Sequence, residues 1–230
     1  MRILAIDTCL ADISAAVSRA PGHAECETFR HERDALQRLA GIIRDVLGRS
    51  GLRPEDIELV VCTRGPGSFT GLRVGVAAAK AFAAAAGAQM AGPSTLAMLA
   101  ANVETPGALV VPLIEACPGE VYCGAYRVGG AGEALAEVAP DQVCPASNLE
   151  HWLDALGSPG PVIIGPAAAK YASCIGAARV EEGFDTVSIL RVIEWGRAAA
   201  ESGGLTGPLD FQPEYLRASH AEIRRAEGKG

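Results

Sequence analysis

The chain of 230 residues is short of positive charge. Its 20 lysines and arginines face 27 aspartates and glutamates, which gives a formal net charge of −7. Proteins that bind nucleic acid through their overall charge need an excess of clustered cations, because each phosphate contact takes one. The composition therefore argues against this class and leaves room only for a local basic strip.

Motifs for metals and nucleophiles are also scarce. The sequence has four histidines and no HxxxH or HExxH pair, so the usual spacing of a zinc hydrolase is missing. It has no GxSxG serine elbow. The seven cysteines are odd in number and form no CxxC pair, which indicates a reducing compartment rather than a disulfide framework.

Long apolar runs and a leader pattern are missing from the sequence as well. The chain begins MRILAID and has no basic region, apolar stretch and cleavage site of a secretory signal. The alanine-rich run at 76–86 is too short to span a bilayer and contains Lys80. We therefore expect a soluble cytoplasmic protein without membrane contact.

What the sequence does contain is a central segment from Ile57 to Ala91. An apolar run at 57–62 leads into the glycine-rich loop GPGSFTG, and a helix follows at 68–86. Ser68 suits the N-cap and Gly87 suits a left-handed C-cap. Gly71 and Gly75 each cost about 1 kcal/mol relative to alanine inside a helix, which indicates close approach by another backbone.

This loop and helix allow two interpretations. A helix N-terminus with free amides can hold an anion, and Gly67 and Ser68 would then belong to a phosphate cradle. The sequence continues without the Gly-Lys-Ser/Thr of a P-loop and does not match GxGxxG. The second interpretation is a capped helix that packs closely against another element, and both remain open here.

Both halves of the chain show the same predicted order of elements, βββαβαβα. In the first half, strands are predicted at 2–7, 13–18, 24–29 and 57–62, and helices at 33–48, 68–86 and 94–103. In the second, strands are predicted at 108–114, 120–127, about 133–139, 161–164 and 178–181, and helices at 147–157, 167–175 and 187–202.

The duplicated order predicts an α/β, two-lobe actin-like (ribonuclease H-like) fold in which helices cover a mixed sheet in each lobe. We expect the first lobe at 1–105, a smaller second lobe at 106–204, and a C-terminal segment at 205–230 whose last residues form a mobile tail.

In such a fold, residues that follow the first strand of each lobe are candidates for nucleotide contacts. Asp7 and Thr8 stand at the end of the first strand, and Glu115 takes the corresponding place in the second lobe. Each also has a simpler interpretation, since a turn aspartate often accepts local amides. Pro166 stands where a nucleotide-binding lobe would have a second glycine, which argues against a standard adenine site.

The helices at 33–48 and 68–86 have apolar faces that either cover the sheet or meet a partner. From the pattern alone both uses remain open, and a partner interface would be formed by the helix face at 33–48 and the Gly/Ala side of 68–86. The predicted interface residues are Leu36, Leu39, Ile43, Leu47, Gly71, Leu72, Gly75, Ala78, Ala79 and Phe82.

Four segments taken together resemble one known family. ILAIDT at the start, RGPGSFTGLRVGVAAAKAFA in the centre, GEVYCGAYR and the late PEYLR are similar to the TsaB (YeaZ) family, a small glycoprotease-like paralogue linked to threonylcarbamoyladenosine at tRNA position 37. The match runs in order over most of the chain, and GPGSFTG is its most specific part.

This resemblance implies a noncatalytic scaffold rather than an enzyme. It implies pairing with the catalytic TsaD-type paralogue through the helices at 33–48 and 68–86, a TsaE-type ATPase as a further partner, and homodimers through the same surface. It implies contact with tRNA only through the complex. It implies no cofactor for the chain alone and leaves open a weak ATP/ADP and magnesium site at the complex interface.

Some positions differ from the family pattern. The catalytic paralogue has a metal-binding HxxxH just after the position of Ala91, where this chain has PSTLAML. Glu115 and Cys117 stand where relatives often have Asp and Arg, and Ala35 stands where many have His. Two other functions remain as alternatives: a standalone actin-like ATPase or sugar kinase using Asp7, the 65–68 loop and Glu115, and, less favoured, a metalloprotease.

Overall fold

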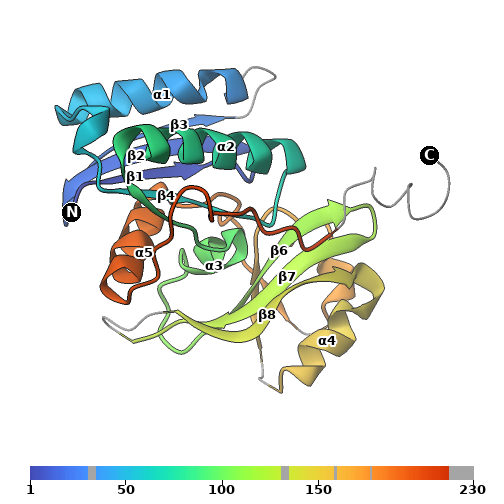
Figure 1. The fold of residues 1–230 in the computed structure, drawn as a ribbon. Coiled ribbons are helices and arrows are strands. Elements are labelled where there is room, and N and C mark those ends of the chain that lie inside the picture. Colours follow the sequence, from blue (N-terminus) through green and yellow to red (C-terminus); the bar gives the residue numbers. More distant parts are fainter. Residues whose placement is uncertain (31–34, 131–134, 158–159, 177, 218–230) are drawn as a thin grey trace, which may run out of the picture.

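The computed structural model describes residues 1–30, 35–130, 135–157, 160–176 and 178–217 and shows two lobes, each built on a five-stranded mixed sheet (Figure 1). The first sheet has the order β3-β2-β1-β4-β5 and the second the order β8-β7-β6-β9-β10. In both, the first three strands of the lobe pair antiparallel and the later ones pair parallel. The duplicated order predicted from the sequence is therefore confirmed in the arrangement of the strands.

The first lobe follows the predicted elements closely. A strand predicted only by the repeated order appears as β5. The elements are β1 Ile3–Asp7, β2 Asp12–Ala20, β3 His23–Arg30, α1 Ala35–Ser50, a 3-10 turn Pro54–Asp56, β4 Leu59–Cys62, α2 Phe69–Ala86, β5 Gln89–Ala91 and α3 Thr95–Ala100. Residues 33 and 34 of the predicted first helix lie outside the described residues.

The second lobe differs from prediction in two elements. Its members are β6 Leu109–Cys117, β7 Glu120–Arg127, β8 Ala136–Pro145, a 3-10 turn Ala146–Asn148, α4 Leu149–Ala155, β9 Val162–Ile164, a 3-10 turn Ala172–Cys174, β10 Arg179–Val180 and α5 Ile189–Glu201.

Strand β8 is longer than the predicted 133–139, of which 133 and 134 lie outside the described residues. It pairs with β7 as far as Pro145 opposite Glu120 and passes Pro140 at a register shift. Prolines usually stop a strand, and here an irregular edge accommodates one.

The predicted helix at 167–175 is wrong, because that segment forms consecutive turns and the short 3-10 helix between Gly165 and Gly176. Both glycines have positive φ angles, 95° and 58°.

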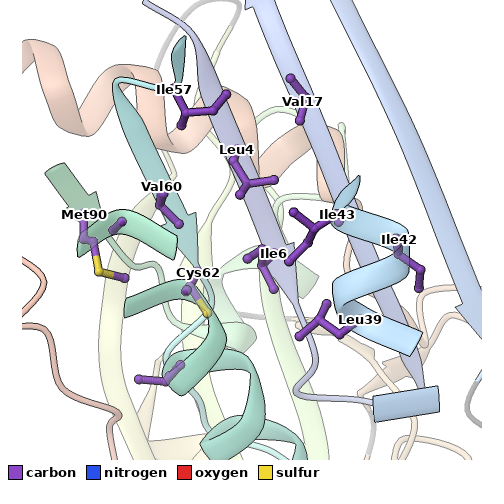
Figure 2. Packing of buried hydrophobic residues seen from close by; sticks show 14 of the residues in the cluster. Leu4, Ile6, Val17, Leu39, Ile42, Ile43, Ile57, Val60, Cys62 and Met90 are labelled. Carbon is purple, nitrogen blue, oxygen red and sulfur yellow. The ribbon is translucent and has the colours of Figure 1, made fainter. Parts of the chain in front are cut away.

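Side chains alternate across β1 and divide the core into layers. Leu4 and Ile6 point to the face covered by α1 and α2, together with Val60 and Cys62 of β4 (Figure 2). Ile3 and Ala5 point to the opposite face, where they join a cluster that includes residues of α3, α5 and the second sheet. A third cluster lies between the second sheet and α4. The order of layers is thus α1/α2, first sheet, α3/α5, second sheet, α4.

Helix α5 comes from the second half of the sequence but packs on the first sheet (Figure 1). It contacts β1, β2 and β4, and Gly196 lies so close to Val61 that a Cβ would stand 2.2 Å from its Cγ2. The expectation that residues 106–204 form a separate lobe thus does not describe α5. A helix can cover whichever apolar face lies beside it, and the first sheet offers that face here.

The C-terminal segment from Leu205 to Arg217 runs along both lobes, and we refer to it as the strap (Figure 1). Thr206 pairs with Met90 beside β5, and Phe211 is buried in the core of the first lobe. Lys80 of α2 donates to the carbonyl of Phe211 at 2.7 Å. Arg217 then reaches Glu120 of β7 with an Nε–Oε2 distance of 3.1 Å. The residues beyond 217, predicted as a mobile tail, lie outside the described part.

Candidate functional site

Helices α1 and α2 lie side by side on the outer face of the first sheet (Figure 1). Between them runs a groove of about 670 Å³. Its lining is apolar apart from three polar side chains, and consists of Gln37, Leu39, Ala40, Ile43, Arg44, Leu47, Gly48, Leu52, Arg53, Pro54, Val74, Ala78 and Phe82. We call this the α1/α2 groove. It is an open apolar surface of the first lobe.

The two helices form the groove by different means. Leu39, Ile43 and Leu47 recur every four residues on α1 and form its buried base, where they join the core of the lobe. Val74, Ala78 and Phe82 repeat the same spacing on α2 but stay partly exposed. The helical period therefore places one apolar row against the sheet and a second row toward solvent.

The predicted interface residues differ in their exposure to solvent. Ala78 and Phe82 are partly exposed in the groove, where a partner could reach them. Five others are buried in the chain's own core: Leu39, Ile43, Leu47, Leu72 and Ala79. Leu36 lies in α1, but its side chain is outside the described part of the structure.

Gly71 and Gly75 do not belong to an open surface, which corrects their place in the predicted interface. A Cβ at Gly71 would stand 2.1 Å from the carbonyl oxygen of Thr8, and one at Gly75 would stand 2.0 Å from the Thr8 hydroxyl. Both glycines are buried, and Thr8 donates its hydroxyl to the Gly71 carbonyl at 2.8 Å. The close approach inferred from the two glycines is real, and its partner is the end of β1 in the same chain.

The open small residues of the groove are elsewhere, and the sequence analysis did not single them out. Ala40 and Gly48 are exposed on α1, and no atom lies within 4 Å of a Cβ placed on Gly48. Together with Arg44 they follow a four-residue spacing parallel to the buried row of Leu39, Ile43 and Leu47. That spacing was visible in the sequence, but only the position of the sheet shows which row faces outward.

Asp7 is buried at the end of β1 and is held by its own chain. Thr63 donates to its Oδ1 at 2.5 Å, and the Cys9 amide donates to the same oxygen at 3.3 Å. Burial raises the pKa of Asp7 to about 6, and the hydrogen bonds oppose this rise. Of the two interpretations of Asp7, the local one describes these contacts: its carboxyl group organises the turn after β1.

The GPGSFTG loop packs against that same turn. The Ser68 amide donates to the Cys9 carbonyl at 2.8 Å, and the Ser68 hydroxyl caps α2 by accepting from the Gly71 amide at 3.2 Å. A Cβ at Gly67 would stand 2.2 Å from the Cys9 carbonyl oxygen. The loop thus brings Gly67 and Ser68 beside Asp7 and Thr8, and the backbone of Cys9 occupies the space next to Gly67.

Glu115 is engaged within the second lobe. It accepts from Lys170, and Tyr171 donates to it at 3.2 Å. The hydrogen bond from Lys170 holds the pKa of Glu115 below its ordinary value. Cys117, two residues further along β6, donates to Glu120, which also accepts from Arg217 of the strap. In the described residues these contacts tie Glu115 and Cys117 to their own lobe and strap.

A second cavity, of about 1370 Å³, lies beside α3 and α5 and is more polar than the α1/α2 groove. At its edge, Ser94 caps α3 and donates to Asp141, which also accepts from Tyr126. Burial raises the pKa of Asp141. This network was not predicted, because its members come from three separate segments. Among the described residues, no group of three or more His, Cys, Asp or Glu side chains could hold a metal ion.

Comparisons with known proteins agree with the fold described above. Residues 30–181 match the family model described as TsaD, tRNA N6-adenosine threonylcarbamoyltransferase. The chain belongs to this family. TsaB of Bacillus subtilis is 29% identical to this chain over 240 aligned residues that cover both chains completely. TsaB of Escherichia coli is 36% identical over 129 residues, which cover 55% of each chain.

These relatives place the chain in the TsaB (YeaZ) group of the family. Solved structures support the fold in particular. YeaZ from Pseudomonas aeruginosa superimposes with a TM-score of 0.79 at 22% identity, covering 94% of this chain and 99% of that one. The predicted two-lobe, actin-like α/β fold is confirmed.

Proposed function

We propose that this chain is a noncatalytic TsaB-type subunit in the biosynthesis of tRNA threonylcarbamoyladenosine. Its TsaB relatives are named for that pathway, and the match to the B. subtilis protein spans both chains. The observation that carries the scaffold role is the open, apolar α1/α2 groove, which the chain leaves uncovered in its described part. The proposed partner is a TsaD-type paralogue, and the proposed location is the cytoplasm.

The groove has the features of a docking surface. An exposed apolar patch bordered by polar side chains marks an interaction site. Val74, Ala78 and Phe82 supply the partly exposed apolar wall, while Ala40 and Gly48 allow a partner helix to come close. Helix α2 is long and apolar enough to cross a membrane by length and composition, but a single helix of this kind is weak evidence for a span, and the inner side of α2 packs into the core of the first lobe.

A nucleotide-dependent enzyme is the less favoured function. Asp7 and Thr8 are buried and bonded within the chain, and Gly67 contacts the Cys9 backbone. The proposal therefore assigns no cofactor to the isolated chain. Any ATP/ADP and magnesium site would belong to the complex, in which a TsaE-type ATPase is a further partner. Without a partner, the chain would form a homodimer. It would contact tRNA only through the complex.

The test places an arginine in the groove. We expect Ala40→Arg to abolish co-elution with the TsaD-type paralogue in size-exclusion chromatography, because the bulky charge enters the exposed row of α1. Ala84→Arg is the matched control: Ala84 is also exposed, on α2, but does not line the groove. Unimpaired co-elution of Ala40→Arg would contradict docking at this site.

Reconstitution then tests the function itself. We expect threonylcarbamoylation of tRNA by the purified partner proteins to require this chain, and to be lost with Ala40→Arg but kept with Ala84→Arg. Full modification without this chain would contradict the scaffold role, and hydrolysis of Mg-ATP by the isolated chain would favour the enzyme instead.

A further inference from the structure

The ionisable side chains that line the α1/α2 groove have a single sign. Arg44 of α1 and Arg53, before the turn Pro54–Asp56, are its only charged members among the described residues. Gln37 is the remaining polar one, and no described carboxylate lines the groove. On a chain with a net charge of −7, a groove whose described lining has two arginines and no carboxylate is distinctive.

The acidic neighbours of these arginines stand outside the groove. Arg44 pairs with Asp45, the next residue on α1, at 3.0 Å, and Arg53 pairs with Asp56 at 3.7 Å. Both arginine side chains are 79% exposed. Exposed pairs of this kind contribute little to stability, since water and salt screen them. The two guanidinium groups are therefore available for stronger bonds when a partner excludes water from the groove.

We propose that Arg44 and Arg53 select the occupant of the groove: a partner helix face with carboxylates beside an apolar ridge, in preference to a second copy of this chain. This inference rests on the proposed function. A two-fold homodimer brings the same patch from each copy together, so it would collect two arginines from each side with no carboxylate in the lining. Like charges brought together in an interface oppose association, and opposite charges favour it.

The apolar part of the groove cannot discriminate between the paralogue and a second copy of this chain. Val74, Ala78 and Phe82 offer the same shape and the same burial to any apolar ridge, whether it comes from a paralogue or from another copy. Discrimination between two partners of similar shape requires an element that repels the wrong one. In the described groove, only the two arginines can repel a second copy of this chain.

The test removes the charge and follows two equilibria. The variant is Arg44→Gln combined with Arg53→Gln, and the control is Arg127→Gln combined with Arg179→Gln, two exposed arginines of the second lobe. Binding of the TsaD-type paralogue is measured by isothermal titration calorimetry at low and high salt. Self-association is measured by sedimentation velocity in the same buffers.

We expect opposite changes in the groove variant at low salt. Binding of the paralogue should weaken about ten-fold, which corresponds to about 1.4 kcal/mol, while self-association should become tighter. High salt should weaken binding of the paralogue by the wild type, so that its affinity approaches that of the variant. The control should match the wild type in both equilibria.

Other outcomes would overturn the inference in distinguishable ways. If the wild type binds the paralogue and the groove variant changes neither equilibrium, or shifts both in one direction, the charge selection is wrong while docking stands. If the wild type shows no binding of the paralogue, the proposed function is wrong and the selection falls with it.

Discussion

At the scale of single residues, the polar groups expected to meet a ligand are satisfied by the chain. Asp7 accepts from Thr63 and from the Cys9 amide, and the Thr8 hydroxyl donates to Gly71. Asp7 is 2% exposed, so its carboxylate has lost most of its hydration. Removing a carboxylate from water favours its protonated form, which agrees with the raised pKa.

The raised pKa of Asp7 predicts a pH dependence of stability. Its pKa is about 6 in the folded state and about 3.9 in the unfolded chain, so the folded protein binds more protons between these values. The free energy of unfolding should therefore fall as the pH rises from about 4 to 6, by about 3 kcal/mol from this group. Asp7→Asn removes this contribution.

Urea denaturation of the wild type and Asp7→Asn from about pH 4 to about pH 7.5 measures the effect. The difference in unfolding free energy, variant minus wild type, should increase with pH and level off above about pH 6.5. Using the difference cancels the titration of the other carboxylates. A difference independent of pH would show that Asp7 ionises normally in the folded protein.

At the scale of elements, helix α2 uses its faces for two purposes. Its glycine face fits against the end of β1, and the row Val74, Ala78, Phe82 borders the groove. The helix can lie this close to the turn after β1 only because Gly71 and Gly75 have no Cβ. The position of α2, and so the shape of the groove, depends on those glycines.

Alanine at Gly75 should therefore lower stability despite its better helix propensity. The new Cβ would meet the Thr8 hydroxyl at 2.0 Å and displace α2 or Thr8. We expect a loss of about 1–3 kcal/mol in the free energy of unfolding, typical of overpacking. Gly48→Ala on α1 is the control, since its Cβ would enter open space and should add up to about 1 kcal/mol.

Chemical denaturation of both variants tests this contrast. A Gly75→Ala protein as stable as Gly48→Ala would mean that α2 is not seated on Thr8. The same contacts explain why a large substitution at Gly75 is a poor probe of docking: it would disturb the fold itself. Ala40 and Ala84 are better positions, because both are exposed.

At the scale of the whole molecule, the two lobes share a core. The middle cluster joins Ile3 and Val61 of the first sheet to Val110 and Tyr126 of the second, with α3 and α5 between them. The strap adds Phe211 to the first lobe and Arg217 to the second. Separating the lobes would expose this apolar layer to water, so we expect them to unfold together.

The two tryptophans allow this to be measured. Trp195 of α5 packs against the shared core, while Trp152 of α4 packs against the outer cluster of the second lobe. Trp152→Phe leaves Trp195 as the fluorescent reporter, and Trp195→Phe leaves Trp152. In each variant, the urea midpoint from fluorescence should coincide with that from far-UV circular dichroism. Separate midpoints within either variant would show that the lobes unfold independently.

The sequence alone determined the order of elements, the limits of most helices and strands, the cap at Ser68 and the close approach at Gly71 and Gly75. These depend on local pattern: helical and strand periods, N-cap chemistry and the steric freedom of glycine. The family resemblance also came from short local motifs. The helix predicted at 167–175 was wrong because the alanine content of this segment favours a helix, while the flanking glycines and local contacts favour turns.

Only the tertiary structure decided what lies against what. It turned the glycine face of α2 toward Thr8 and the row through Val74 and Phe82 toward solvent, and it placed α5 on the first sheet. It also assembled the Ser94–Asp141–Tyr126 network from distant segments. A periodic pattern states that a helix has two faces, but which face is buried depends on the sheet, helix or partner that lies beside it.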